Sequence, residues 1–200
     1  MNPRVKFALL LIAACAIPTG AMAHIGVDNH EHSGFLTGFL HPIGGMDHLA
    51  AMVSVGLWSA LAARRAGPAL LWGPLGFASM LLVGALIGLQ GIAIPAVEPM
   101  IAASLLATGL LVVSRLRVQG IAAALIVGVF AVFHGLAHGY ELAGSPSALH
   151  TLAGMLTATV LLHAAGLTLG WALRSTPVWV PRIAGAAVAL SGGVMLLQLA

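Results

Sequence analysis

The stretch FLTGFLHPIGGMDHLAAMVSVGLWSAL, residues 35–61, is apolar over most of its length but polar in its first half. Residues 41–48 hold two histidines, an aspartate, a proline and a Gly-Gly pair. In the whole chain of 200 residues, 60% are hydrophobic and 6% are charged, whereas about a quarter of the residues of a soluble domain are charged. The composition predicts an integral membrane protein, in which ionisable groups within apolar segments are costly and usually functional.

Six apolar segments follow one another between residues 34 and 200, and each is close to the roughly 20 residues that cross the hydrocarbon core. The connections between them are short. We therefore predict an all-α fold: a polytopic membrane protein with six transmembrane helices that form one domain, residues 34–200. The predicted spans are approximately 34–61, 69–90, 96–113, 119–142, 147–172 and 182–200.

The first 23 residues have the pattern of a signal peptide. Arg4 and Lys6 precede a short apolar run, and Ala21-Met22-Ala23 is a small-x-small cleavage sequence. Cleavage there would leave a short periplasmic segment that contains histidines, residues 24–33. A lipoprotein-type site that ends at Cys15 and an uncleaved anchor are alternative interpretations. Cys15 is the only cysteine, so a metal site in the mature chain would have to use histidine, carboxylate and backbone ligands.

The arginines predict the orientation. They fall between spans one and two, three and four, and five and six, whereas the opposite loops near 91–95 and 143–146 contain no Lys or Arg. The positive-inside rule places the arginine side in the cytoplasm. We therefore expect a multi-pass protein of the bacterial inner membrane with both mature termini in the periplasm. The arginines concerned are Arg64, Arg65, Arg115, Arg117, Arg174 and Arg182.

The first candidate cluster is His41, Asp47 and His48. On an unbroken helix the two histidines share a face but lie about 10 Å apart along the axis, too far for one ion. Proline removes a backbone donor and glycine tolerates non-helical angles, so we predict a helix break that brings the three side chains together. A simple proline kink with hydrogen-bonded histidines is the alternative. The residues expected to form the break are Pro42, Gly44 and Gly45.

The second candidate cluster lies in VFHGLAHGYE, residues 132–141. His134, His138 and Glu141 are spaced by four and three residues, so they share one helical face. Two imidazoles one turn apart commonly chelate a divalent ion. A structural histidine pair beside a buried acid is the alternative. Both clusters belong to the outer halves of their spans under the predicted topology, so we expect them to meet in one site.

Together these motifs resemble the two signatures of the HupE/UreJ family. They are His41-x5-Asp47-His48 and Phe133-His134-Gly135-x-Ala137-His138-Gly139-x-Glu141. That family is associated with hydrogenase and urease operons and is interpreted as nickel or cobalt permeases. The resemblance implies a secondary permease that takes up Ni²⁺, or Co²⁺, and serves hydrogenase or urease maturation proteins indirectly. It also implies a functional set of His41, Asp47, His48, His134, His138 and Glu141.

Four further histidines are secondary candidates. His163 lies in the middle of span five, where it would line the ion path or only bond to a neighbour. His24, His30 and His32 belong to the exported segment and would capture ions before entry; a solvated tail is the alternative. An N-terminal histidine offers an α-amine and an imidazole together, a combination that favours Cu²⁺ or Ni²⁺.

The main alternative function is an intramembrane metal-dependent hydrolase, because three histidines and an acid also resemble a zinc enzyme's ligands. His134 and His138 lack the glutamate of an H-E-x-x-H motif. There is no phosphate-binding G-x-x-x-x-G-K-[ST] sequence, and the few basic residues form no run suited to nucleic acid. We expect no enzyme activity and no catalytic cofactor. Histidine and carboxylate ligands suit Ni²⁺, Co²⁺ and Zn²⁺ alike.

Overall fold

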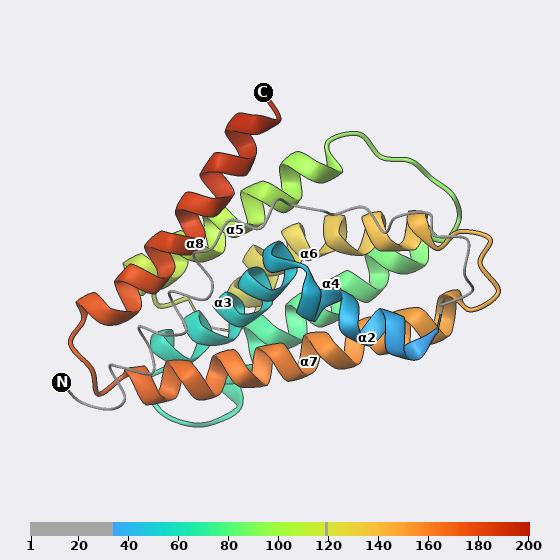
Figure 1. Cartoon of the computed structure of the whole chain (residues 1–200). Coiled ribbons are helices and arrows are strands. Elements are labelled where there is room, and N and C mark those ends of the chain that lie inside the picture. Colours follow the sequence, from blue (N-terminus) through green and yellow to red (C-terminus); the bar gives the residue numbers. More distant parts are fainter. Residues whose placement is uncertain (1–33, 119) are drawn as a thin grey trace.

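The computed structural model describes residues 34–118 and 120–200, and this part of the chain is helical without strands (Figure 1). The all-α prediction is therefore confirmed. The predicted signal peptide (1–23) and the histidine-containing segment (24–33) lie outside the described residues. The elements are α2 (Phe35–Gly44), α3 (Met46–Ala62), the 3₁₀ helix η1 (Pro68–Leu71), α4 (Trp72–Gly88), α5 (Val97–Ser114), α6 (Ile121–Glu141), α7 (Ala148–Leu173) and α8 (Trp179–Gln198).

Five helical segments are long and apolar enough to cross a membrane: η1 with α4, and α5, α6, α7 and α8. Large apolar side chains such as Leu125, Leu161, Leu190 and Leu197 are exposed on these helices, as expected for surfaces that face lipid. The chain is thus a polytopic membrane protein. The first predicted span consists instead of two shorter helices, α2 and α3.

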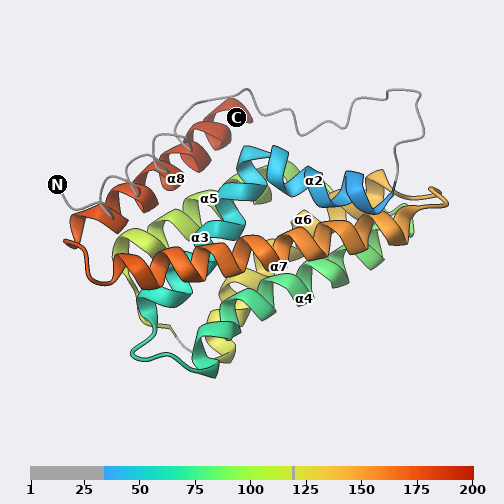
Figure 2. The ribbon, with the colours of Figure 1, turned by 60° about the horizontal axis from the view of Figure 1, so that its bottom comes forward.

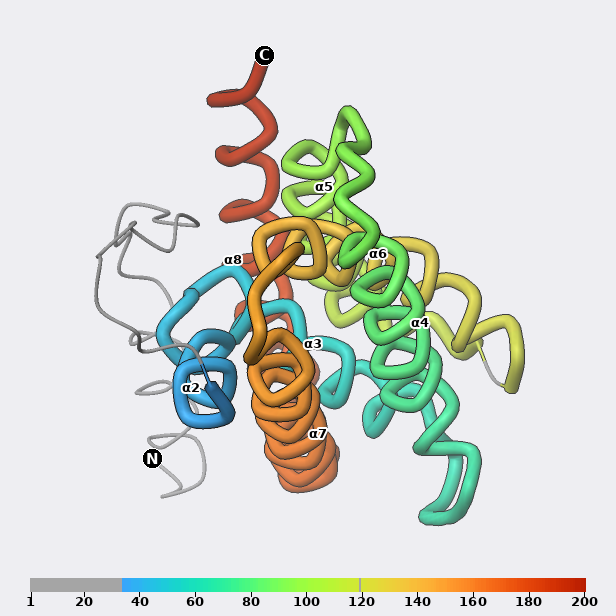
Figure 3. Tube along the Cα trace, turned by 90° about the vertical axis from the view of Figure 1, so that its right-hand side faces the viewer, coloured from blue at the N-terminus to red at the C-terminus, as the bar shows by residue number. Residues whose placement is uncertain are grey.

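The helices associate mainly in pairs: α4 with α6, α5 with α8, and α2 and α3 with α7 (Figures 2 and 3). Small residues permit the close contacts, as they do generally between membrane helices. A Cβ at Gly84 of α4 would overlap the Val132 carbonyl of α6, and one at Gly135 of α6 would overlap the Leu81 carbonyl of α4. The backbones of α4 and α6 therefore touch just before and just after His134 in the sequence of α6.

Helices α2 and α3 pack one after the other along the long helix α7. Gly38 of α2 lies against Thr151 near the start of α7, and Gly56 of α3 lies against His163 near its middle. Their interruption is at Gly45, which is extended at φ −82° and ψ 113°. Of the three residues expected to form the break, Pro42 lies inside α2 and Gly44 ends it. Gly45 alone leaves the helical conformation.

Contacts tie together the helix ends that carry the arginines. Arg174 at the end of α7 donates hydrogen bonds to the carbonyls of Ala63 and Arg64, just after α3. The buried Trp58 indole donates to the Leu116 carbonyl, just after α5, at 2.9 Å. The ends of α3, α5 and α7 therefore lie at the same end of the bundle, in agreement with helices that alternate in direction.

Candidate metal site

The helix interruption brings together two histidines that a continuous helix would separate. His41 lies in the last turn of α2, before the break, and His48 lies in the first turn of α3, after it. Seven residues of straight helix would place them about 10 Å apart along the axis, yet their ring centroids are 5.1 Å apart. The extended Gly45 turns α3 away from α2, so both imidazoles face the same space.

Helix α6 supplies a third imidazole. His138 Nε2 lies 2.7 Å from His48 Nε2, and the His138 ring centroid is 4.7 Å from that of His41. One nitrogen from each of His41, His48 and His138 lies within 4.8 Å of the other two. His48 and His138 are buried, with 3% and 5% of their surfaces exposed, and His41 is partly buried. Three imidazoles so placed could bind one divalent ion after small side-chain movements.

Two carboxylates approach the remaining nitrogens of this histidine cluster. Asp47 Oδ1 lies 2.9 Å from His48 Nδ1, and His138 Nδ1 lies 3.3 Å from Glu141 Oε2. A carboxylate next to Nδ1 favours a proton on that nitrogen and leaves the Nε2 lone pair for a ligand, as is common around metal-bound histidines. Two Nε2 lone pairs would then face each other at 2.7 Å. Such an arrangement requires either a hydrogen on one of the two nitrogens or a cation bound by both.

His134 lies one turn before His138 and is completely buried. Its ring centroid is 5.3 Å from that of His48. Ser104 Oγ donates to the Ile101 carbonyl at 2.6 Å and lies 2.9 Å from His134 Nε2. Because the hydroxyl has given its only hydrogen to Ile101, it must accept one from His134 Nε2. The Nδ1 atom of His134 then carries a lone pair, and no hydrogen bond satisfies it.

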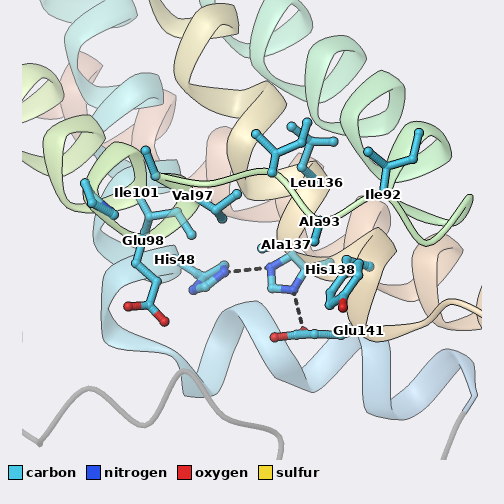
Figure 4. A pocket seen from close by; sticks show the side chains of 14 residues that line it. His48, Ile92, Ala93, Val97, Glu98, Ile101, Leu136, Ala137, His138 and Glu141 are labelled. Atoms are coloured by element: carbon cyan, nitrogen blue, oxygen red, sulfur yellow. Dashed lines mark hydrogen bonds and ion pairs between the residues drawn. The ribbon is translucent and has the colours of Figure 1, made fainter.

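A cavity of about 380 Å³ reaches the histidine cluster (Figure 4). His48 and His138 line it, and Glu98 and Glu141 supply carboxylates beside them. The rest of its lining is mostly apolar and comes from residues 92–101 and 136–140. Glu98 begins α5 and was not among the residues predicted from the sequence. The cavity therefore offers a charged approach to imidazoles that are otherwise enclosed.

Comparisons with known proteins identify the family of the chain. A family profile described as HupE / UreJ protein matches residues 12–196. The chain belongs to the HupE/UreJ family. It is 40% identical over 188 residues to Protein HupE of Rhizobium leguminosarum bv. viciae, an alignment that covers 93% of this chain and 95% of the relative. No solved structure matches the chain significantly. Members of the family are in general transporters of nickel or cobalt associated with hydrogenase or urease.

In this HupE/UreJ protein all six residues of the two motifs lie in one connected group. His41, His48 and His138 form its centre, Asp47 and Glu141 adjoin two of their rings, and His134 adjoins His48. The secondary candidate His163 is separate: its ring contacts Phe77 at 5.2 Å, and Phe77 contacts His134 at 5.8 Å. The candidates His24, His30 and His32 lie outside the described residues.

Two residues of the site were missed by the sequence motifs, Glu98 and Ser104. Glu98 had a detectable signal, because residues 34–200 contain only three acidic side chains, Asp47, Glu98 and Glu141. All three adjoin either the histidine cluster or its cavity. Ser104 had no recognisable sequence signal, because a serine in an apolar helix usually donates a hydrogen bond to a carbonyl of its own helix.

Proposed function

We propose that this protein is a secondary permease for a divalent transition-metal ion, Ni²⁺ in the first place and Co²⁺ as the alternative. The observation that carries the proposal is the convergence of His41, His48 and His138 from separate helices, with His48 and His138 lining a cavity that also contains two glutamates. Neutral imidazoles bind both ions well. Membership of the HupE/UreJ family supports transport, and no observation on the described residues favours the hydrolase.

The proposed topology has six spans after a cleaved signal peptide, with α2 and α3 together as the first span. The two helices run along nearly the whole of α7, which is long enough to cross a bilayer. Trp72, Trp171 and Trp179 are exposed at the end that carries the arginines, where tryptophan commonly marks the membrane interface. This end then faces the cytoplasm, and the cavity faces the periplasm of a bacterial inner membrane.

The entry route begins at the carboxylates. Glu98 and Glu141 raise the local concentration of cations in the cavity, and the imidazoles of His48 and His138 then replace water in the ion's coordination shell. Removing water from a divalent ion is strongly unfavourable in a buried site that has no negative charge of its own. Asp47 and Glu141 offset part of the ion's charge, so a divalent ion could remain within the membrane.

The membrane potential favours inward movement of the ion. One elementary charge gains about 2.3 kcal/mol for each 100 mV that it crosses, and a divalent ion gains about twice as much when the interior is negative. Facilitated diffusion driven by this potential therefore needs no nucleotide. The ion delivered to the cytoplasm would supply the maturation of hydrogenase or urease, so we propose an indirect relation to those maturation proteins.

The direct test uses purified protein in lipid vesicles that contain a metal indicator. The wild-type protein should give saturable Ni²⁺ influx that increases when the interior is made negative. H138L should reduce influx to the level of empty vesicles. H150L is the matched control, because His150 is exposed on the first turn of α7 and away from the cluster. Wild-type vesicles that bind Ni²⁺ without any influx would contradict the permease and leave the hydrolase.

A further inference from the structure

Five buried side-chain atoms in the described part of the chain have no hydrogen-bond partner: His41 Nε2, His48 Nδ1, Ser59 Oγ, His134 Nδ1 and His163 Nε2. Leaving a buried polar atom without a partner is unfavourable, so each of these atoms is a candidate for a ligand. His48 Nδ1 has Asp47 as its ion-pair partner at 2.9 Å, and the atoms of His41 and His134 lie at the candidate metal site, where an ion would satisfy them. Those of His163 and Ser59 lie elsewhere and are not used by the proposed entry site.

His163 lies deeper than the cluster along the proposed direction of transport. It is near the middle of α7, 2% exposed, and packs against Gly56 of α3. Gly56 follows His48 by eight residues of continuous α3, which corresponds to about 12 Å along the helix. The imidazole is thus displaced from the cluster toward the end of the bundle that carries the arginines.

Ser59 lies one turn farther along α3 than Gly56. It is 8% exposed, and a Cβ at Gly73 of α4 would come 2.5 Å from its hydroxyl oxygen. Gly73 precedes Phe77 by one turn of α4, and Phe77 contacts His163. Ser59 and His163 therefore both border the region where α3, α4 and α7 meet, next to residues of α4 that are one helical turn apart.

The Phe77 ring contacts both His163 and His134, the histidine that adjoins His48 at the candidate metal site. It is 1% exposed, and its centroid lies 5.8 Å from the His134 ring and 5.2 Å from the His163 ring. Buried ionisable groups in membrane helices usually face an interior path and mark an ion route. An aromatic ring between two imidazoles would divide such a route into an outer and an inner compartment.

We propose that His163 Nε2 and the Ser59 hydroxyl form a second, transient station for the transported divalent ion, on the inner side of Phe77. This proposal rests on the permease function. The station has one imidazole and one neutral oxygen, and the three acidic side chains of residues 34–200 all lie at the outer cluster or its cavity. It should therefore bind the ion more weakly than the outer cluster, and weak successive sites allow an ion to leave. Phe77 must rotate for the ion to pass.

The test replaces His163 by two side chains of nearly equal size that differ in ligand strength. H163C offers a thiolate for Co²⁺ and H163S does not. Both variants carry C15A, so that H163C has a single thiol, at position 163, and H163S has none. Full-length protein in detergent is titrated with Co²⁺ while visible absorption is recorded. Binding of Co²⁺ to nitrogen and oxygen ligands at the outer cluster gives d–d bands, which also show that each variant is folded.

We expect H163C to develop an additional sulfur-to-cobalt charge-transfer band after the first equivalent of Co²⁺, and H163S to lack it. In vesicles H163S should lower the maximal rate of Co²⁺ influx about tenfold, with little change in the half-saturating concentration set by the outer cluster. Normal d–d bands without a charge-transfer band in H163C, or wild-type flux in H163S, would overturn the inner station. Failure of the permease function itself would differ, because the wild-type protein would then show no influx.

Discussion

His48 Nε2 and His138 Nε2 lie 2.7 Å apart, although ninety positions separate them in the chain. They come from α3 and α6, and each has a carboxylate near its other nitrogen. The pair therefore joins the two sequence motifs into one unit, with the third imidazole, His41, brought in by the interruption at Gly45. The consequences of this arrangement are measurable residue by residue.

If both motifs bind the same ion, the losses of Ni²⁺ binding free energy in the two single variants should not add up in the double variant. We expect H48A and H138A each to weaken Ni²⁺ binding at least about tenfold, and the double variant to be little worse than the poorer single variant. Isothermal titration calorimetry on protein in detergent measures this, with H150A as the control. Strictly additive losses would mean that the two histidines act at independent sites.

The interruption at Gly45 should be sensitive to a single methyl group. A Cβ there would lie 3.1 Å from both Asp47 Oδ1 and His48 Nδ1, whereas one at Gly44 has nothing within 4 Å. Because φ is −82° at Gly45, alanine is not strained by the backbone, and any effect comes from crowding. We expect G45A to weaken Ni²⁺ binding several-fold and G44A to leave it unchanged. Equal affinities for the two variants would contradict the close packing of the Asp47–His48 pair.

Ser104 should act through the orientation of His134. S104A removes the oxygen that accepts the His134 Nε2 hydrogen and frees the imidazole to rotate. Loss of such an outer partner typically weakens metal binding by about 10–100-fold. Ser114 at the end of the same helix is exposed and bonds only locally, so S114A is the matched control for calorimetry. If S104A binds Ni²⁺ like S114A, His134 does not contribute a ligand.

Glu98 should matter for the approach of the ion. E98Q removes a charge from the cavity without changing its shape, so uptake should fall most at limiting metal and low ionic strength, where attraction of the cation is strongest. E98D keeps the charge and should recover most of the rate. Initial rates in vesicles across a series of Ni²⁺ concentrations separate the two variants. An equal loss in both would indicate that the length of the side chain, and not its charge, is required.

The sequence predicted the bounds of most helices closely, because a run of roughly 20 apolar residues is easy to recognise. The segment predicted at 96–113 is α5 at Val97–Ser114, and the one predicted at 147–172 is α7 at Ala148–Leu173. The position of the break was less predictable. Proline removes only one helical hydrogen bond, and α2 continues for two residues beyond Pro42. The interruption is at Gly45, where the side chains of Asp47 and His48 leave little room for a Cβ.

The motif residues could be placed in one site from the predicted topology, because it puts both clusters in the corresponding halves of their spans. Contacts between helices could not be predicted. The Ser104–His134 hydrogen bond depends on the rotation of α5 about its axis, and the position of Glu98 at the cavity depends on the loop before α5. A nearly uniform apolar sequence contains little information about such rotations, since lipid and protein interiors are similarly apolar.

The last prediction concerns how the bundle holds its histidines in position. Gly135 follows His134 directly, and its backbone touches that of Leu81 in α4. G135A would force α4 and α6 apart and displace His134 and His138 together. Overpacking of this kind costs about 1–3 kcal/mol or more, so G135A should lower the thermal unfolding temperature in detergent and also weaken Ni²⁺ binding. G193A in α8 is the control, because a Cβ there meets nothing within 4 Å and alanine favours the helix by about 1 kcal/mol. It should be neutral or stabilising. A G135A variant with normal stability but lost binding would show that Gly135 matters for the site alone, and not through the contact between α4 and α6.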